Sequence, residues 1–425
     1  MKTPEDYGAI GDGVTDDTAA WQMAVDSGEP VKAKSSKYKC GTISIKADSI
    51  IDCNDAEFSC IAATLFNCGK SDEEDQPGAY SGTDYTANQR GYTIQNDNFT
   101  GIAYLYGTNN IFKQRSYYRG GSVEYFKDGV MQTTIPVDIT NVTVQELDTI
   151  SVTIRGIKNV DFESYTGDDP PVVIKMQYCK DSVVESVNVT NACYSILQLL
   201  QCYNCAYKNS EFDIPQYGER GQYYYPIGIY DSCYTLIEGV KGHCTGWHCA
   251  STGAHTLCRQ THVKDCDFST SYPIPAYGDH PNGIETFIEN SSLTSAGLGV
   301  LGRLSRCKIT PTLDDRNICR INLDVCSVNE LAVYTIDDCE FYPVSVAESD
   351  IGIYCYPQPS GYDSDYVFDK LTLKNCNNRT NVNMPIRIRK STDVTGTIDV
   401  GSITVINSNT LINAVANKKT YLYCD

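Results

Sequence analysis

No long hydrophobic run occurs in the 425 residues of this sequence. No segment is therefore long and apolar enough to span a bilayer as a helix, and we expect no membrane partner. The N-terminus, from Met1 to Asp6, is not followed by an apolar stretch either, so we expect neither a secretory signal nor a transit peptide. Helical periodicity is almost absent past residue 30, which favours an all-β chain.

Positive charge is in short supply. The chain has 34 basic against 53 acidic residues, a formal net charge of −19. Nucleic acids and anionic membranes are polyanions, so this balance argues against both as partners. A neutral or weakly charged glycan remains compatible with it.

A second CxxC motif is missing, although the chain has 20 cysteines. The one such motif, Cys202 to Cys205, is interpreted as part of the core or a turn. Without a secretory signal, the cysteines are predicted to be reduced thiols that act as small buried hydrophobic groups. A zinc site at His243-Cys244 and His248-Cys249, or a calcium site at Asp72 to Asp75, is a weaker alternative, so we expect no metal and no cofactor.

Short runs of similar form recur along the chain. Each run reads apolar, polar, Asn/Asp/Ser, small, polar, apolar, and some neighbouring runs lie about 23 to 26 residues apart. That period is typical of a solenoid, in which each coil buries its apolar side chains only by stacking on the next coil. The small position, often Cys, is expected to point into a narrow interior. The runs are Val184 to Val189, Tyr207 to Phe212, Val263 to Phe268, Ile288 to Leu293 and Ile336 to Phe341.

A solenoid needs a cap at its end, because unpaired strand edges would otherwise pair with other chains. The segment Asp16 to Val25 predicts a short helix with an Asp N-cap and a stop at Gly28, and Trp21 is expected to close the first coil. We therefore divide the chain into an entry motif and capping helix (1–30), a parallel β-helix (31–378), and last coils with a C-terminal cap (379–425).

The segment Asp6 to Gln22 resembles the opening signature of the pectate-lyase-like β-helix superfamily, which includes phage tailspikes, tail depolymerases and polygalacturonase-like enzymes. The resemblance implies a single-stranded right-handed parallel β-helix, which is all-β apart from the short N-terminal capping helix. It also implies a homotrimer. It implies no particular reaction, because the Gly and Asp residues of this motif are suited to turns and caps.

All five histidines fall within 38 residues, from 243 to 280. If Val263 and Ile288 stack on neighbouring coils, His255 and His280 become partners about one coil apart. We therefore predict a catalytic group of His255, Asp279, His280 and Glu285. The alternative is that these side chains lie on an extended β surface and have no catalytic function.

Sugar-binding side chains are predicted around this group: Trp247, His248, Tyr224, Tyr277 and Arg303. A glycosidase needs two carboxylates about 5 to 9.5 Å apart. A lyase needs a base and a cation that holds a uronate carboxylate. The predicted group and its surroundings contain the residue types for either reaction. The irregular stretches Lys70 to Gln89 and Asp213 to Gly228 are candidate rims of a glycan groove.

These observations favour a phage tailspike-type protein that binds and depolymerises a bacterial surface polysaccharide. It is expected to fold in the host cytoplasm and to act on the virion beside other tail proteins. The alternative is a receptor-binding or baseplate protein that uses the same surface without catalysis. If Asp279→Asn and Glu285→Gln leave the activity of the protein unchanged, that alternative is favoured.

Overall fold

A computed structural model describes most of the chain. No helix in this part is long and apolar enough to cross a membrane. The described residues are 1–69, 76–110, 119–167, 169–190, 195–214, 225–245, 248–253, 255–271, 274–280, 282–311, 320–324, 331–344, 349–355, 366–382, 384–390, 398–408 and 421–424.

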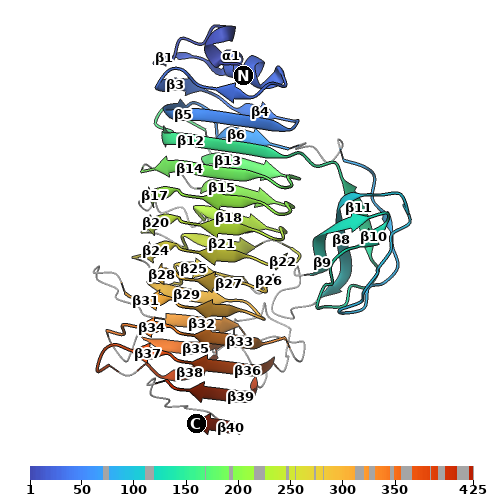
Figure 1. The fold of residues 1–425 in the computed structure, drawn as a ribbon, viewed down its shortest axis with the longest axis vertical. Helices are drawn as coiled ribbons and strands as arrows, with labels where there is room; N and C mark the ends of the chain where they lie inside the picture. Colours follow the sequence, from blue (N-terminus) through green and yellow to red (C-terminus); the bar gives the residue numbers. More distant parts are fainter. Residues whose placement is uncertain are drawn as a thin grey trace.

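The chain winds into a right-handed parallel β-helix, as the repeats and the opening motif predicted (Figure 1). The strands of the solenoid form three stacked rows, and neighbours within a row are parallel. The predicted stacking is confirmed, since Val184 pairs with Tyr207 and Val263 pairs with Ile288. Apolar side chains point inward along every row and form one continuous core.

The three rows have the following bounds. The first row holds β5 (Ser49–Cys60), β12 (Val152–Asp161), β14 (Val183–Val189), β16 (Ala206–Lys208), β19 (Leu236–Glu238), β23 (His262–Lys264), β27 (Phe287–Glu289), β30 (Arg303–Ser305), β33 (Val333–Asp337), β36 (Tyr366–Lys374), β39 (Ile398–Ile406) and β40 (Tyr421–Cys424). The second row holds β17 (Glu211–Ile214), β20 (Lys241–Cys244), β24 (Asp267–Thr270), β28 (Ser292–Leu293), β31 (Lys308–Ile309), β34 (Glu340–Phe341) and β37 (Asn377–Asn378). The third row holds β4 (Ile43–Ile45), β6 (Thr64–Cys68), β13 (Val172–Gln177), β15 (Ser195–Leu200), β18 (Ile227–Tyr230), β21 (Ala250–Gly253), β25 (Tyr277–Gly278), β29 (Ser295–Leu298), β32 (Arg320–Asp324), β35 (Asp350–Cys355) and β38 (Ile386–Lys390).

The turn between the first and second rows explains the Asn/Asp/Ser position of the repeat. Asn209, Asp265 and Asn290 occupy it with φ of 48°, 54° and 49°, in the left-handed region that these residues tolerate. The backbone N–H of each donates to a carbonyl of the next coil, for example Asn209 to Glu238 at 2.9 Å. The small residue that follows points inward, and where it is Cys266 it is buried. The repeat therefore encodes one tight, stackable corner per coil.

The described cysteines are free and buried, as predicted. Fifteen of the 20 cysteines of the sequence are described in this way, and none of these fifteen forms a disulfide. Cys202 and Cys205 belong to the core, so the CxxC motif has a packing role in this structure.

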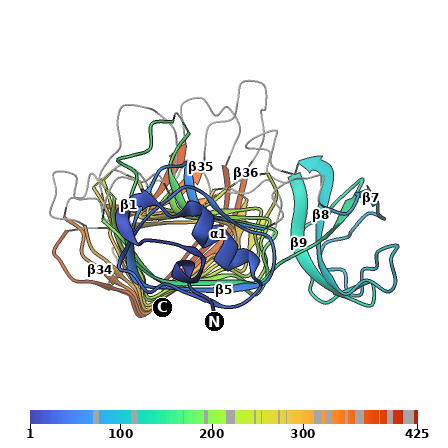
Figure 2. The same ribbon diagram turned by 90° about the horizontal axis from the view of Figure 1, so that it is seen from above.

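The N-terminal end is capped as expected (Figure 2). The helix α1 (Thr18–Asp26) follows the short 3-10 helix η1 (Pro4–Tyr7), and β1 (Asp12–Asp16), β2 (Val31–Lys32) and β3 (Lys37–Cys40) lie beside it in the sequence. Trp21 is fully buried, and its ring lies 5.1 Å from that of Tyr38 and 5.5 Å from that of Phe58. The carboxylate of the N-cap residue Asp17 accepts hydrogen bonds from the backbone N–H groups of Ile10 and Gly11, and it ties the opening motif to the cap.

An antiparallel sheet interrupts the solenoid between β6 and β12 and projects from its side (Figures 1 and 2). The irregular stretch Lys70 to Gln89, of which 70–75 lies outside the described residues, was visible in the sequence, but the antiparallel module was not predicted. The boundary near Asn378 stays a prediction. The strands of the module are β7 (Tyr80–Ser81), β8 (Gly101–Asn110), β9 (Arg119–Lys127), β10 (Val130–Met131) and β11 (Thr143–Leu147).

The module contacts the solenoid at the bend between the third and first rows. There β22 (Cys258–Arg259) pairs with β26 (Gly283–Ile284) on the next coil. The backbone N–H of Arg119 donates to the carbonyl of His255 at 2.7 Å, and that of Leu257 donates to Gly121 at 3.1 Å. The inserted sheet is thus hydrogen-bonded to a coil far away in the sequence.

Candidate functional site

The histidine cluster of the sequence is divided among several surfaces of the solenoid. His262 lies on β23 of the first row, and His243 lies on β20 of the second. His248 and His280 flank strands of the third row, whereas the exposed His255 lies at the bend that meets the inserted module. Proximity in the sequence therefore does not produce one catalytic patch from all five.

His248, His280 and Tyr225 form one group over the third row. The Tyr225 hydroxyl lies 2.5 Å from Nε2 of His280, and the Tyr225 ring centroid is 5.5 Å from that of His248. Nδ1 of His248 lies 2.5 Å from the carbonyl oxygen of Pro275, so the proton is on Nδ1 in this contact. Burial lowers the pKa of His248 to about 4, although the hydrogen bond to Pro275 acts in the opposite direction. His248 is therefore neutral at pH 7.

Asp279 precedes His280 in the sequence, and its carboxylate is buried. It accepts hydrogen bonds from Thr252 Oγ1 at 3.0 Å, from the Tyr277 hydroxyl at 2.9 Å and from the backbone N–H of Gly299 at 2.9 Å. Burial raises the pKa of Asp279, and these hydrogen bonds only partly offset that rise. Tyr277 is fully buried. The Asp279 carboxylate joins neighbouring coils through Thr252 and Gly299, and neither Asp279 nor Tyr277 presents its polar group at the surface.

Glu285 belongs to a different group, which anchors the inserted module. Arg259 donates to Glu285 from Nη2 at 3.0 Å, to the carbonyl of Thr134 at 2.7 Å, and also to Glu124 of β9. The side chains of Arg259 and Glu124 are 3% and 0% exposed, whereas that of Glu285 is 20% exposed. Burial opposes the charge of Arg259, but Glu124 and Glu285 outweigh it and raise the pKa of the guanidinium. Glu285 is thus an ion-pair partner at the edge of a buried junction.

Arg303, another predicted binding residue, lies on the first row. Arg303 is exposed on β30 and lies 3.8 Å from Asp337, a loose surface ion pair. Trp247 and Tyr224 lie outside the described residues, as does most of the predicted rim between Asp213 and Gly228. The catalytic and binding roles assigned from the sequence stay predictions.

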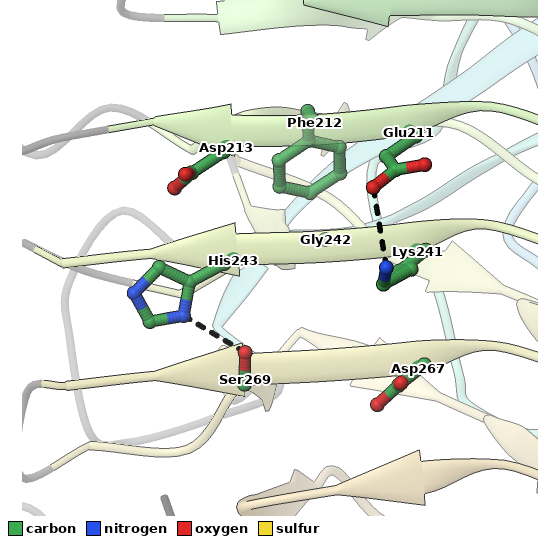
Figure 3. A pocket seen from close by; sticks show the side chains of 8 residues that line it. All are labelled: Glu211, Phe212, Asp213, Lys241, Gly242, His243, Asp267 and Ser269. Carbon is green, nitrogen blue, oxygen red and sulfur yellow. Dashed lines mark hydrogen bonds and ion pairs between the residues drawn. The ribbon is translucent and has the colours of Figure 1, made fainter. Parts of the chain in front are cut away.

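A pocket on the outer surface of the second row gathers acid, base and cation from three successive coils (Figure 3). It has a volume of about 180 Å³ and extends over β17, β20 and β24. We call it the trough, because two columns of polar side chains border it. Glu211, Lys241 and Asp267 form one column, and Asp213, His243 and Ser269 form the other, each column in register across the three strands.

The floor of the trough depends on an unusual core contact. Phe212 and Gly242 alternate with the bordering residues and face the core. A Cβ at Gly242 would lie 2.2 Å from the Phe212 ring, so that ring occupies the space that a side chain would fill. The Phe212 and Phe268 rings pack 6.3 Å apart.

The two columns place carboxylates on both sides of the floor. Glu211 and Asp213 are two residues apart on one strand, so their side chains leave the same surface about 6.6 Å from each other. The ammonium of Lys241 lies 3.2 Å from Glu211, and Nδ1 of His243 lies 2.8 Å from Ser269 Oγ. The arrangement can hold a substrate between two carboxylates and can transfer protons on either side of it.

Most of the trough was missed from the sequence, where only histidines served as markers. The available signal lay in the repeat itself. Tyr207 to Phe212 and Val263 to Phe268 were aligned, and the polar residues that flank the second apolar position, Glu211 and Asp213 or Asp267 and Ser269, fall in outward columns by that alignment.

Metal ligands do not gather in the part of the chain that the structure describes, where no group of three or more His, Cys, Asp or Glu side chains could hold an ion.

Three solved structures of phage tailspikes share this architecture. The tailspike gp61 of Pseudomonas phage phi297 superposes with a TM-score of 0.65 and 13% identity, covering 99% of this chain and 79% of that one. The tailspike gp49 of Pseudomonas phage LKA1 gives 0.65 and 16%, covering 98% and 81%. The chain has the fold of a phage tailspike. A third tailspike, Gp54 of Acinetobacter baumannii bacteriophage AP22, was solved in complex with A. baumannii capsular saccharide and gives a TM-score of 0.66 at 14% identity, covering 100% of this chain and 76% of that one.

The likeness to these tailspikes lies in structure. No protein-family model and no curated sequence matches the chain. At 13 to 16% identity the tailspike structures establish the fold, and the chemistry of the site has to be argued from its own residues.

Proposed function

We propose that this protein is a tailspike-type virion protein that binds a bacterial surface polysaccharide in the trough and cleaves it there. The observation that carries the proposal is the pair Glu211 and Asp213, which border the trough on the same exposed surface of β17. The capsular saccharide bound by the AP22 tailspike supports the choice of ligand class. Proton transfer to the leaving oxygen and activation of the attacking group both need such flanking groups.

We propose that the two carboxylates act as an inverting pair. Carboxylates about 6.5 to 9.5 Å apart leave room for a water molecule and are typical of inverting glycosidases. The Cα atoms of Glu211 and Asp213 are about 6.6 Å apart along β17, and we propose that their carboxyl groups hold a substrate at a separation within that range. Lys241 stands beside Glu211 and lies opposite His243 across the floor. We assign the carboxylate beside Lys241 as the base and Asp213 as the acid.

Two further parts of the proposal concern the assembly. A homotrimer attached to other tail proteins is the arrangement that the family resemblance implies, and sedimentation equilibrium tests it by giving the mass of the particle. The alternative function, glycan binding without cleavage, uses the same surface but needs no carboxylate pair.

The test is a panel of bacterial capsular and exopolysaccharides incubated with purified protein, followed by measurement of new reducing ends. We expect Glu211→Gln and Asp213→Asn each to reduce the cleavage rate by at least about 100-fold, the usual minimum for loss of general acid–base catalysis. Glu340→Gln is the matched control, since Glu340 is a carboxylate on β34 of the same row, outside the trough, and pairs with Arg379.

Each result decides between stated alternatives. Retained cleavage in both trough variants, together with loss in His280→Ala or Glu285→Gln, would overturn the trough and support the group predicted from the sequence. Binding without cleavage of every glycan in the panel would support the non-catalytic alternative.

A further inference from the structure

We infer that the trough hydrolyses a polysaccharide whose residue at the cleavage point is neutral or carries a protonated amine, and that it does not act as a lyase on uronates. This inference rests on the proposed function. Its first support is charge. Glu211, Asp213 and Asp267 bring three carboxylates to the trough, whereas Lys241 is the one ammonium among its lining residues. A uronate placed there would meet a surface of its own sign.

The second support is that the cation is already engaged. A lyase removes the proton alpha to a uronate carboxylate, and it needs a positive group to hold that carboxylate while charge accumulates on it. Lys241 lies 3.2 Å from Glu211 in an exposed ion pair, so it would have to leave the proposed base to hold a uronate carboxylate. Along the same column, Asp267 pairs with Ser292 of β28, and Ser292 pairs with Lys308 of β31. In this described column the next lysine is therefore two strands beyond Asp267, about 9.6 Å away.

The third support is the polar but uncharged surroundings of the trough. Asn188 precedes Glu211 in the first column, and Ser292 follows Asp267. Ser269 ends the second column within the trough, beside His243. Amide and hydroxyl groups exchange hydrogen bonds with sugar hydroxyls without demanding a charge. The strands are about 4.8 Å apart, so a glycan lying along the solenoid axis meets a new pair of side chains on each coil.

The reaction that follows from this arrangement is a balanced hydrolysis. A water molecule loses a proton to Glu211 as its oxygen forms a bond to the anomeric carbon. The bond from that carbon to the glycosidic oxygen breaks, and Asp213 gives a proton to the leaving oxygen. The products are two saturated chains, one with a new reducing end of inverted configuration.

The experiment uses the polysaccharide that the wild-type protein cuts in the panel above, together with a derivative in which carbodiimide activation and borohydride have reduced every uronate to a neutral sugar. We expect reducing ends without the ultraviolet absorbance of unsaturated uronates, and a rate on the derivative within threefold of the original. Proton NMR of the first products is expected to show the inverted anomer.

Unsaturated products, or a loss of more than tenfold in rate on carboxyl reduction, would overturn the inference while leaving the trough as the site of cleavage, provided that Glu211→Gln still abolishes it. If no polysaccharide is cut, the proposed function itself fails, and this inference fails with it. Glu340→Gln is again the control for changes in charge outside the trough.

Discussion

Asp279, one residue of the predicted catalytic group, has a structural role in the solenoid. Its carboxylate accepts hydrogen bonds from Thr252, Tyr277 and Gly299, which lie on three successive coils. A catalytic acid must reach the substrate, whereas this group is only 6% exposed. Polar residues that stack inside a solenoid can therefore cluster in the sequence in the same way as the residues of an active site.

Substitution of Asp279 separates the two roles. We expect Asp279→Asn to lower the free energy of unfolding by about 1 to 3 kcal/mol, because one amide nitrogen must then face a donor that formerly met an oxygen. Glycan cleavage by the folded fraction is expected to stay at the wild-type rate. Thermal unfolding and a cleavage assay on the same samples provide both readouts. A variant with an unchanged melting temperature and no activity would restore Asp279 to the catalytic group.

His248 predicts a dependence of stability on pH. Burial holds its pKa near 4 in the folded chain, below the ordinary value of 6.5. Folding thus favours the neutral ring, and this contribution is fully present above pH 6.5 and is lost as the pH falls toward 4. A shift of this size corresponds to as much as about 3 kcal/mol.

The matched variant for this prediction is His248→Asn, which keeps a donor for the Pro275 carbonyl but does not titrate. Between pH 7 and pH 4.5 the melting temperature of the wild type is expected to fall more than that of the variant. Parallel curves for the two proteins would show that His248 is not the group responsible.

At the scale of elements, the inserted sheet and the solenoid are joined by one buried ion cluster. Arg259 comes from β22, Glu124 from β9 and Glu285 from the coil after Arg259. Removal of one partner leaves a buried charge without compensation, which costs about 3 to 5 kcal/mol. We therefore expect Arg259→Met to destabilise the protein strongly. We also expect the module to become accessible to protease before the solenoid does.

Limited proteolysis with mass mapping, together with thermal unfolding, measures this effect. Arg155→Met is the control, because Arg155 also bonds a carboxylate, Asp52 at 3.1 Å, but is 46% exposed. Surface pairs of this kind contribute about 0 to 1 kcal/mol. Equal effects of the two substitutions, or no early cleavage within residues 76–147 of the Arg259 variant, would contradict the anchoring role.

The elements also show what could be read from the sequence. The stacked rows, the corner residue such as Asn209 and the cap around Trp21 were predictable, because each coil repeats the same local requirement. The inserted sheet has its own antiparallel pairing and follows no such repeat, so only its irregularity was visible. The junction of Arg259 with Glu124 joins residues 135 positions apart, and no local pattern encodes that contact.

The candidate site was less predictable for a related reason. In a solenoid, residues meet when they share a column, and their distance in the sequence then equals one coil or a multiple of it. Asp213, His243 and Ser269 meet across β17, β20 and β24, whereas His255 and His243 are close in sequence and lie on different surfaces. The column in which a residue lies depends on the register of every coil. Residue type alone could therefore not identify the residues that meet in the trough.

At the scale of the whole molecule, the free thiols line the core along much of its length. Burial raises the pKa of Cys60 to about 11 and that of Cys266 to about 12, so neither is a thiolate at pH 8. Alkylating reagents attack the thiolate, and they must also reach it. All fifteen described cysteines are buried in the folded protein, so they fail the second condition whatever the pKa of each thiol.

We therefore expect native protein treated with iodoacetamide at pH 8 to gain at most five labels, the difference between 20 cysteines and the fifteen that are described as buried. In guanidinium chloride without reductant we expect all 20 to react, since none of the fifteen described cysteines forms a disulfide and the other five are predicted to be reduced as well. Intact mass measures both numbers. More than five labels on the native protein would mean that the solenoid opens on the timescale of labelling, and fewer than 20 labels after unfolding would reveal disulfides in place of packed thiols.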